Sequence, residues 1–103
     1  MIVEYIRYRV PPERASEFLA AYDAAAATLE GDDQCLSYEV SQGHEEPDRF
    51  VVRIEWTSLE DHLQGFRRSP EFRQFFQAVK PFFDDIEEMK HYDAHRTFTR
   101  VPT

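Results

Sequence analysis

One histidine is placed where a side chain could exchange a proton with a bound molecule. His62 lies three residues after Leu59 and four before Phe66, and on a helix these positions share one face. Histidine gains and loses its proton near neutral pH, so His62 beside an apolar pocket could accept a phenolic proton. The same spacing also suits a histidine that only packs at the edge of the core. We nominate His62 as a catalytic candidate and keep the packing role as the alternative.

Aromatic side chains could form the walls of such a pocket. They make up 15% of the chain and give a small core much buried area per residue. Trp56 could stack on a planar substrate and donate its indole N–H, or it could serve packing alone. We nominate it as the second catalytic candidate. The candidates for substrate contact are Phe66, Phe72, Phe76 and Tyr38. Four further tyrosines have hydroxyls that could reach a substrate oxygen: Tyr5, Tyr8, Tyr22 and Tyr92.

The remaining titratable residues do not form a recognisable metal site. His91 and His95 could share a zinc ion on a helix, but on the strand expected over 87–96 they would lie about 13 Å apart. His91 and Asp93 are close enough, yet no third ligand is evident nearby. The acidic stretch Asp84–Glu88 is typical of a solvated turn. We therefore expect no bound metal.

Nucleophilic and nucleotide-binding motifs are also absent from the sequence. The single Cys35 cannot form an internal disulfide and excludes every CxxC site. It has no cationic neighbour that would lower its pKa, so a small core residue is the better interpretation. The sequence contains no GxGxxG, Walker A, GxSxG or HExxH motif.

Composition predicts one small globular domain spanning residues 1–103. Hydrophobic residues make up 42% of the chain and charged residues 31%, the balance of an ordinary soluble globule. Twelve Lys and Arg against twenty Asp and Glu leave a net charge of −8, which argues against nucleic-acid binding. No apolar run is long enough to span a membrane. Glu4, Arg7 and Arg9 interrupt the first apolar stretch, so we expect no signal peptide and a cytoplasmic location.

Periodicity predicts the elements that must position the candidate residues. Alternation indicates strands at 2–10, Cys35–Gln42, Phe50–Trp56 and, with poorer alternation, 87–96. Helical spacing indicates a helix at 13–29, a second beginning at Thr57-Ser58, and a further segment from Ser69-Pro70 to Pro81. Ser58 with Asp61 has the spacing of a capping box, and Ser69-Pro70 is typical of an N-cap and first helical residue. The order β-α-β-β-α-β predicts an α+β, ferredoxin-like fold, an antiparallel sheet with helices on one face.

The other face of that sheet needs a partner. It would carry Val3 and Val51 together with Arg7 and Arg53. A second sheet would cover these side chains, so we expect a homodimer. Arg7 and Arg53 could stabilise a substrate anion, but interface salt bridges fit their expected position better.

Four segments in this order resemble the antibiotic biosynthesis monooxygenase (ABM) family. They are Asp33–Glu39, the strand ending in Glu55-Trp56, Ser58-Leu59-Glu60, and Ser69-Pro70-Glu71-Phe72. The resemblance covers residues 1–95 and leaves 96–103 as a C-terminal extension. It implies a dimeric α+β barrel, in which two sheets face each other and each subunit holds a pocket between its sheet and its helices.

The resemblance also implies an activity. Some members oxidise aromatic polyketides or quinols with O2 and use no metal or organic cofactor, and others degrade haem. The position matching Phe66 is a histidine in many quinol-oxidising members, and the haem-degrading branch carries its iron ligand near the position matching Phe76. Phenylalanine can neither ligate iron nor move a proton, so we do not expect haem. His62, however, lies one turn before Phe66.

We therefore expect a cofactor-independent monooxygenase that oxidises a small aromatic quinol or polyketide-like molecule, with O2 as co-substrate. This chemistry requires a base, a group that stabilises the substrate anion, and a dry apolar slot. The alternative is a non-catalytic homodimer that binds a small ligand or has a structural role. Haem degradation is the third hypothesis.

Overall fold

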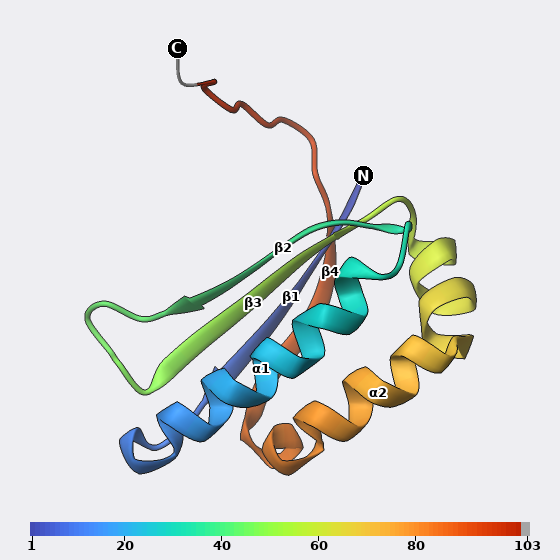
Figure 1. The fold of residues 1–103 in the computed structure, drawn as a ribbon. Helices are drawn as coiled ribbons and strands as arrows, with labels where there is room; N and C mark the ends of the chain where they lie inside the picture. The colour runs from blue at the N-terminus through green and yellow to red at the C-terminus, as the bar shows by residue number, and fades with distance from the viewer. Residues whose placement is uncertain (102–103) are drawn as a thin grey trace.

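A four-stranded antiparallel sheet with two α-helices on one face forms the body of the molecule (Figure 1). The computed structural model describes residues 1–101. The strands are β1 (Ile2–Arg9), β2 (Cys35–Gln42), β3 (Arg49–Trp56) and β4 (Ile86–Asp93). The α-helices are α1 (Ala15–Glu30) and α2 (Pro70–Val79), and the shorter helical turns are η1 (Pro12–Arg14), η2 (Asp61–Gly65), η3 (Phe66–Arg68) and η4 (Lys80–Asp85). The ferredoxin-like α+β prediction is confirmed.

Strand β1 lies between β3 and β4, in the sheet order β2-β3-β1-β4. The register places Glu4 of β1 opposite Ile54 of β3 and opposite His91 of β4. Residues directly opposite one another in an antiparallel pair project from the same face of the sheet. The topology therefore brings Glu4 and His91 together on the helix side, although they are far apart in sequence.

Alternation along β3 places every second side chain in the core. These residues are Phe50, Val52, Ile54 and Trp56, each at most 1% exposed. Helix α1 contributes Phe18, whose ring centroid lies 4.6 to 5.3 Å from those of Tyr8, Tyr22, Phe50 and Phe82. Much of the high aromatic content thus serves packing, as expected where a small domain needs large buried side chains.

The segment after β3 begins as predicted but continues as a wider turn. The Ser58 hydroxyl accepts a 3.0 Å hydrogen bond from the Asp61 backbone N–H, which is the predicted cap. The next residues form the π-helical turn η2, so Leu59 falls outside the buried side and is 41% exposed. His62 and Phe66 remain buried on the core side. The prediction that Leu59 lies on the same helix face as His62 and Phe66 was therefore wrong.

Helix α2 starts at the predicted cap. The Ser69 hydroxyl accepts a 3.2 Å hydrogen bond from the Phe72 backbone N–H, and Pro70 occupies the first turn. The helix ends at Val79, and η4 carries the chain into β4.

The last strand is shorter at its C-terminal end than the predicted 87–96. Asp93 already pairs with Ile2, the first residue of β1. The N–H of Ala94 makes one more backbone hydrogen bond, of 3.1 Å, to the carbonyl of Met1. Beyond that point β1 offers no further partner, and the chain extends away from the sheet (Figure 1).

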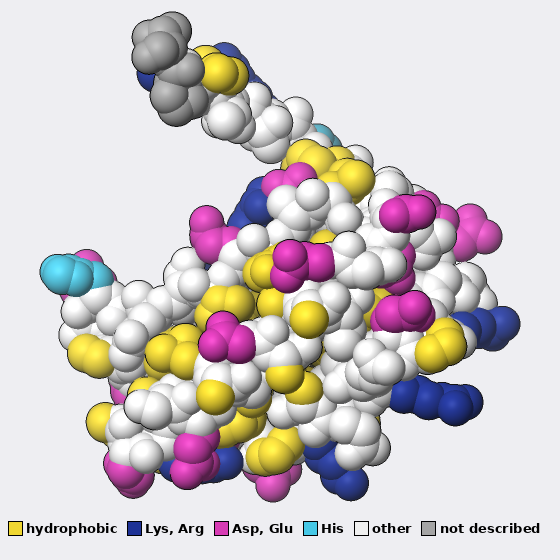
Figure 2. Space-filling view, in the orientation of Figure 1, with side chains coloured by type: hydrophobic (Ala, Val, Ile, Leu, Met, Phe, Trp, Pro, Cys, Tyr) yellow, Lys and Arg dark blue, Asp and Glu magenta, His cyan; other side chains and the backbone are white. Residues whose placement is uncertain are grey.

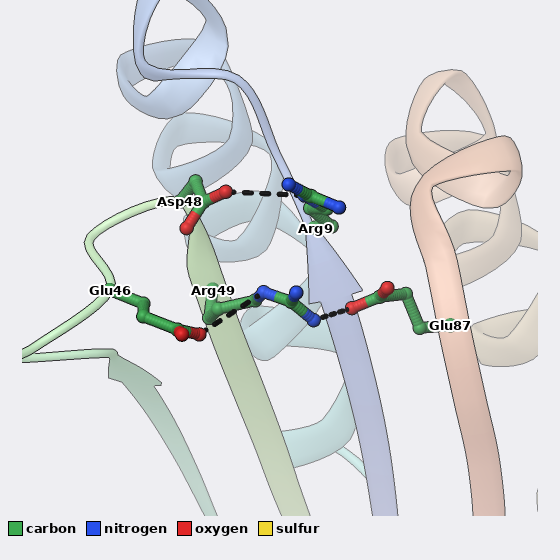
Figure 3. Close-up of polar contacts among 5 residues, drawn as sticks. All are labelled: Arg9, Glu46, Asp48, Arg49 and Glu87. Atoms are coloured by element: carbon green, nitrogen blue, oxygen red, sulfur yellow. Dashed lines mark hydrogen bonds and ion pairs between the residues drawn. The ribbon is translucent and has the colours of Figure 1, made fainter.

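Ion pairs hold the opposite end of β1 (Figure 3). Arg49 reaches Glu46 at 3.4 Å and also pairs with Glu87, while Arg9 pairs with Asp48 at 3.2 Å. Partly exposed pairs of this kind each contribute about 0–1 kcal/mol. They connect the turn between β2 and β3 to β1 and β4. This end of the sheet is the one opposite Trp56.

The surface on the helix side is mainly acidic and neutral. Figure 2 shows Asp and Glu side chains spread over this face and Lys and Arg mostly towards its edges. This distribution agrees with the net charge of −8. None of the helices within residues 1–101 is long and apolar enough to cross a membrane.

Candidate functional site

A cavity of about 470 Å³ lies between the sheet and the helical segments that follow β3. Pockets for small ligands commonly have volumes of about 300–1,000 Å³. Most of the lining is aromatic or aliphatic, from β1, β3, β4, α2 and η4. The lining side chains that carry a polar group are Glu4, Tyr8, Trp56, His62 and Arg67. The site is thus an apolar slot with a few polar groups.

Five of the residues nominated from the sequence line this cavity. They are His62, Trp56, Phe66, Phe72 and Phe76. The sixth, Tyr38, does not. It is half-buried on the edge strand β2, where its hydroxyl donates a 2.9 Å hydrogen bond to Glu30. Tyr38 therefore lies apart from the other five, on the edge strand and hydrogen-bonded to α1.

The rings of His62 and Trp56 pack against each other, tilted by 32°, at the buried end of the site. Their ring centroids are 4.4 Å apart, and Phe66 lies 5.0 Å from Trp56 on centroids. His62 is 3% exposed and Trp56 is fully buried. Since His62 comes from η2 and Trp56 from the end of β3, the π-helical turn is what brings the imidazole over the indole.

Glu4 is the central polar residue of the site, and the sequence analysis did not nominate it. Its Oε1 accepts a 3.2 Å hydrogen bond from Trp56 Nε1–H. Its Oε2 lies 3.6 Å from Nε2 of His62 and 3.7 Å from Nε2 of His91. The signal was present in β1, where Glu4 is the only charged residue on the side of the strand shared by Ile2, Ile6 and Tyr8.

The carboxyl of Glu4 is only 3% exposed, yet its surroundings favour the ionised form. Burial raises the pKa of Glu4, but His62, His91 and the Trp56 N–H together lower it below its ordinary value. Burial also lowers the pKa of His91, an effect that Glu4 opposes and His62 and Arg67 reinforce. The site therefore holds a buried carboxylate facing two imidazole rings.

Tyr8 adds a second polar group to the cavity wall. Its hydroxyl and that of Tyr22 are 2.5 Å apart in a buried hydrogen bond. Burial raises the pKa of Tyr8 to about 12, so the phenol stays protonated at neutral pH. Of the other tyrosines considered, Tyr5 and Tyr92 pack edge to face with centroids 5.4 Å apart, on the sheet face that points away from the helices.

The other nominated groups lie elsewhere. Arg53 pairs with Glu55 at 2.6 Å on the sheet face away from the helices, as predicted from its parity. Burial raises the pKa of the Cys35 thiol to about 11, which agrees with the expectation that it is a poor nucleophile.

Comparison with known proteins identifies the family. The family model for antibiotic biosynthesis monooxygenase matches residues 1–78. The uncharacterized protein YczJ of Bacillus subtilis is 26% identical over 92 residues, which cover 89% of this chain and 97% of YczJ.

Two solved structures illustrate the shared fold. A Bordetella bronchiseptica protein carrying the same family name has a TM-score of 0.79 and 22% identity, with 92% of this chain and 97% of that chain covered. A Deinococcus radiodurans protein with the same family name has a TM-score of 0.73 and 20% identity, with 99% and 100% covered. These structures establish the fold. The family match over residues 1–78 shows that the chain belongs to the antibiotic biosynthesis monooxygenase family.

Proposed function

We propose that this protein is a cofactor-independent monooxygenase that oxidises a small aromatic quinol or polyketide-like molecule with O2. The observation that carries the proposal is the buried Glu4–His62 pair at the wall of an aromatic cavity of about 470 Å³. Membership of the ABM family supports the reaction class. The cavity supports a planar, mostly apolar substrate.

In the proposed reaction the aromatic walls hold the substrate while a phenolic proton passes to an imidazole nitrogen of His62. Glu4 stabilises the imidazolium that results, because its Oε2 lies 3.6 Å from Nε2 of His62. The substrate anion then passes an electron to O2. For a hydroxyanthrone, the ring CH2 becomes C=O with one oxygen atom, and the other oxygen atom leaves as water.

Two further groups in the cavity fit this scheme. Arg67 lines the cavity and supplies a positive charge towards an anionic substrate. Tyr8, protonated at neutral pH because its pKa is about 12, supplies a hydroxyl that is already engaged with Tyr22. Phe76 of α2 and Phe83 of η4, with ring centroids 4.7 Å apart, form part of the apolar wall.

Oxygen uptake tests the proposal. Chelator-treated protein is mixed with a panel of hydroxyanthrones and quinols, with heat-denatured protein as the blank for autoxidation. We expect saturable uptake above the blank that survives chelation and falls at least about a hundredfold in His62→Gln. His44→Gln, which changes an exposed histidine, is the matched control and should retain full activity.

Two other outcomes favour the alternatives. Stoichiometric binding of an aromatic ligand without oxygen consumption would assign the cavity to a ligand-binding dimer. A Soret band on titration with haem, lost in His62→Gln, would instead support haem chemistry.

We also infer that the protein pairs with a second copy through the sheet face that points away from the helices. This face carries the Tyr5–Tyr92 contact and the Arg53–Glu55 ion pair. Sedimentation equilibrium should give twice the chain mass. Val51→Asp on this face should shift the mass towards one chain, whereas Leu19→Asp on α1, which is 42% exposed, should not.

A further inference from the structure

Three potential metal ligands converge from three separate elements. Glu4 comes from β1, His62 from η2 and His91 from β4. One ligand atom of each lies within 4.8 Å of the other two. Glu4 and His91 are directly opposite in the β1–β4 register, so the sheet itself fixes two of the three groups. The third, His62, is held by packing of its ring against Trp56.

Three of the four ring nitrogens of this cluster are buried without a hydrogen-bond partner within residues 1–101. Both ring nitrogens of His62 and Nε2 of His91 are buried and unpaired. The imidazole-to-carboxylate distances, 3.6 and 3.7 Å, are too long for hydrogen bonds. Buried polar groups are rarely left without a partner. The cluster therefore has the electron pairs and the negative charge to hold a cation between its members.

The distances between the Glu4 carboxylate and the two imidazoles suit ligands of one metal ion better than a direct hydrogen bond. Two ligands of a tetrahedral ion, each about 2.1 Å from it, lie about 3.4 Å apart. The two distances from Glu4 Oε2 exceed this value by only a few tenths of an ångström, and the ligand nitrogens of His62 and His91 lie within 4.8 Å of each other. Binding an ion would therefore draw the two imidazole rings closer together by side-chain rotation.

We propose that Glu4, His62 and His91 form a binding site for one divalent transition-metal ion of the zinc and cobalt type. Two imidazole nitrogens and one carboxylate oxygen are the donor set these ions prefer, whereas magnesium and calcium favour oxygen ligands alone. Trp56 supports the site because its N–H holds Oε1 of Glu4 and leaves Oε2 for the ion. Glu4 and His62 also line the cavity, so water or a substrate oxygen could complete the coordination.

This inference replaces the sequence-based expectation that the chain binds no metal, and it does not rest on the proposed oxygenase activity. The metal site and the proposed reaction share His62. A metal ion bound to its ring nitrogen would occupy the electron pair that accepts the substrate proton. We therefore expect stoichiometric Zn2+ to inhibit any oxygen uptake measured with the metal-free protein.

Direct metal titration tests the site without any substrate. Untagged, chelator-stripped protein is titrated with Co2+ while the visible absorption is recorded, and with Zn2+ by calorimetry. We expect one ion per chain and the intense visible bands of low-coordinate cobalt. Glu4→Gln, His62→Gln and His91→Gln should each weaken zinc binding at least about tenfold.

Matched variants keep the result interpretable. His44→Gln and His95→Gln change exposed histidines and should leave the affinity unchanged. His91 is partly exposed, with 24% of its side chain accessible, so His91→Gln tests the site even if the more buried variants fail to fold. Absence of binding, or binding that His91→Gln leaves intact, would overturn the proposal. Metal binding without oxygen uptake would uphold this site and reject the proposed function.

Discussion

The indole of Trp56 donates a 3.2 Å hydrogen bond to one oxygen of Glu4, and the other oxygen of that carboxylate faces His62 and His91. Trp56 therefore does more than pack. It fixes the rotation of a buried carboxylate, and its ring also packs against that of His62, with centroids 4.4 Å apart. Trp56 and Glu4 thus connect the apolar wall of the cavity to the buried polar cluster of Glu4, His62 and His91.

Glu4→Gln should show whether the Glu4 charge acts on the reaction step or on substrate binding. The amide keeps an acceptor for the Trp56 N–H but removes the charge that stabilises a protonated His62. We expect kcat for oxygen uptake to fall about tenfold to hundredfold with little change in KM. Glu45→Gln, at an exposed position in the turn between β2 and β3, is the matched control. An unchanged kcat in a folded Glu4→Gln variant would remove Glu4 from the mechanism.

Phe76→Ala should weaken substrate binding at small cost in stability. Phe76 is half-buried in the cavity wall, with Phe72 at 6.0 Å and Phe83 at 4.7 Å between ring centroids. Full burial of a phenylalanine would make this change cost about 3–5 kcal/mol, so we expect about 2 kcal/mol or less in urea unfolding. KM should rise about tenfold, because lost apolar contact acts on ground-state binding. Phe98→Ala, at a 77% exposed position, should change neither quantity.

Most of the fold was predictable because side-chain alternation and helix caps are local signals. Strand β2 has the predicted bounds, and the caps at Ser58 and Ser69 form as expected. The end of β4 was not predictable from its own residues, since it is set by where β1 begins. The π-helical turn η2 has no side-chain signature and was missed for that reason.

Only the part of the candidate site formed by residues after β3 was predictable from the sequence. The aromatic residues after Trp56 are close in sequence, and helical spacing was enough to group them with His62. Glu4 and His91 meet only through the β1–β4 register, which pairs the two ends of the chain. Sequence alone did not give the strand order, which makes β2 the edge strand and leaves Tyr38 beside Glu30 of α1 instead of in the cavity lining.

Cys35 should react slowly with disulfide reagents in the folded protein. Burial raises the pKa of its thiol to about 11, so little thiolate exists at pH 8. The higher nucleophilicity of a more basic thiolate offsets part of this effect. We expect the rate with dithionitrobenzoate at pH 8 to be about a tenth of that of the urea-unfolded chain. A folded-state rate equal to the unfolded rate would show that the thiol is ionised normally.

The Tyr8–Tyr22 pair should make the protein lose stability in alkali. Burial raises the pKa of Tyr8 to about 12 from an ordinary 10.0 and raises that of Tyr22 well above 10.0. In the unfolded chain both phenols ionise near pH 10, so the folded form binds more protons above that pH. Stability is therefore complete below pH 10 and is lost as the pH rises towards 12, by about 1.4 kcal/mol per pH unit for each tyrosine.

Urea unfolding at several pH values between 8 and 12 measures this loss. Other groups also titrate in that range, so the difference between proteins is the informative quantity. Replacing both residues, Tyr8→Phe with Tyr22→Phe, removes the hydrogen-bonded pair together and should flatten the alkaline slope. Tyr92→Phe changes a 45% exposed tyrosine and should leave the slope as it is. If the double variant loses stability as steeply as the unmodified protein, the two buried hydroxyls are not the origin of the alkaline transition.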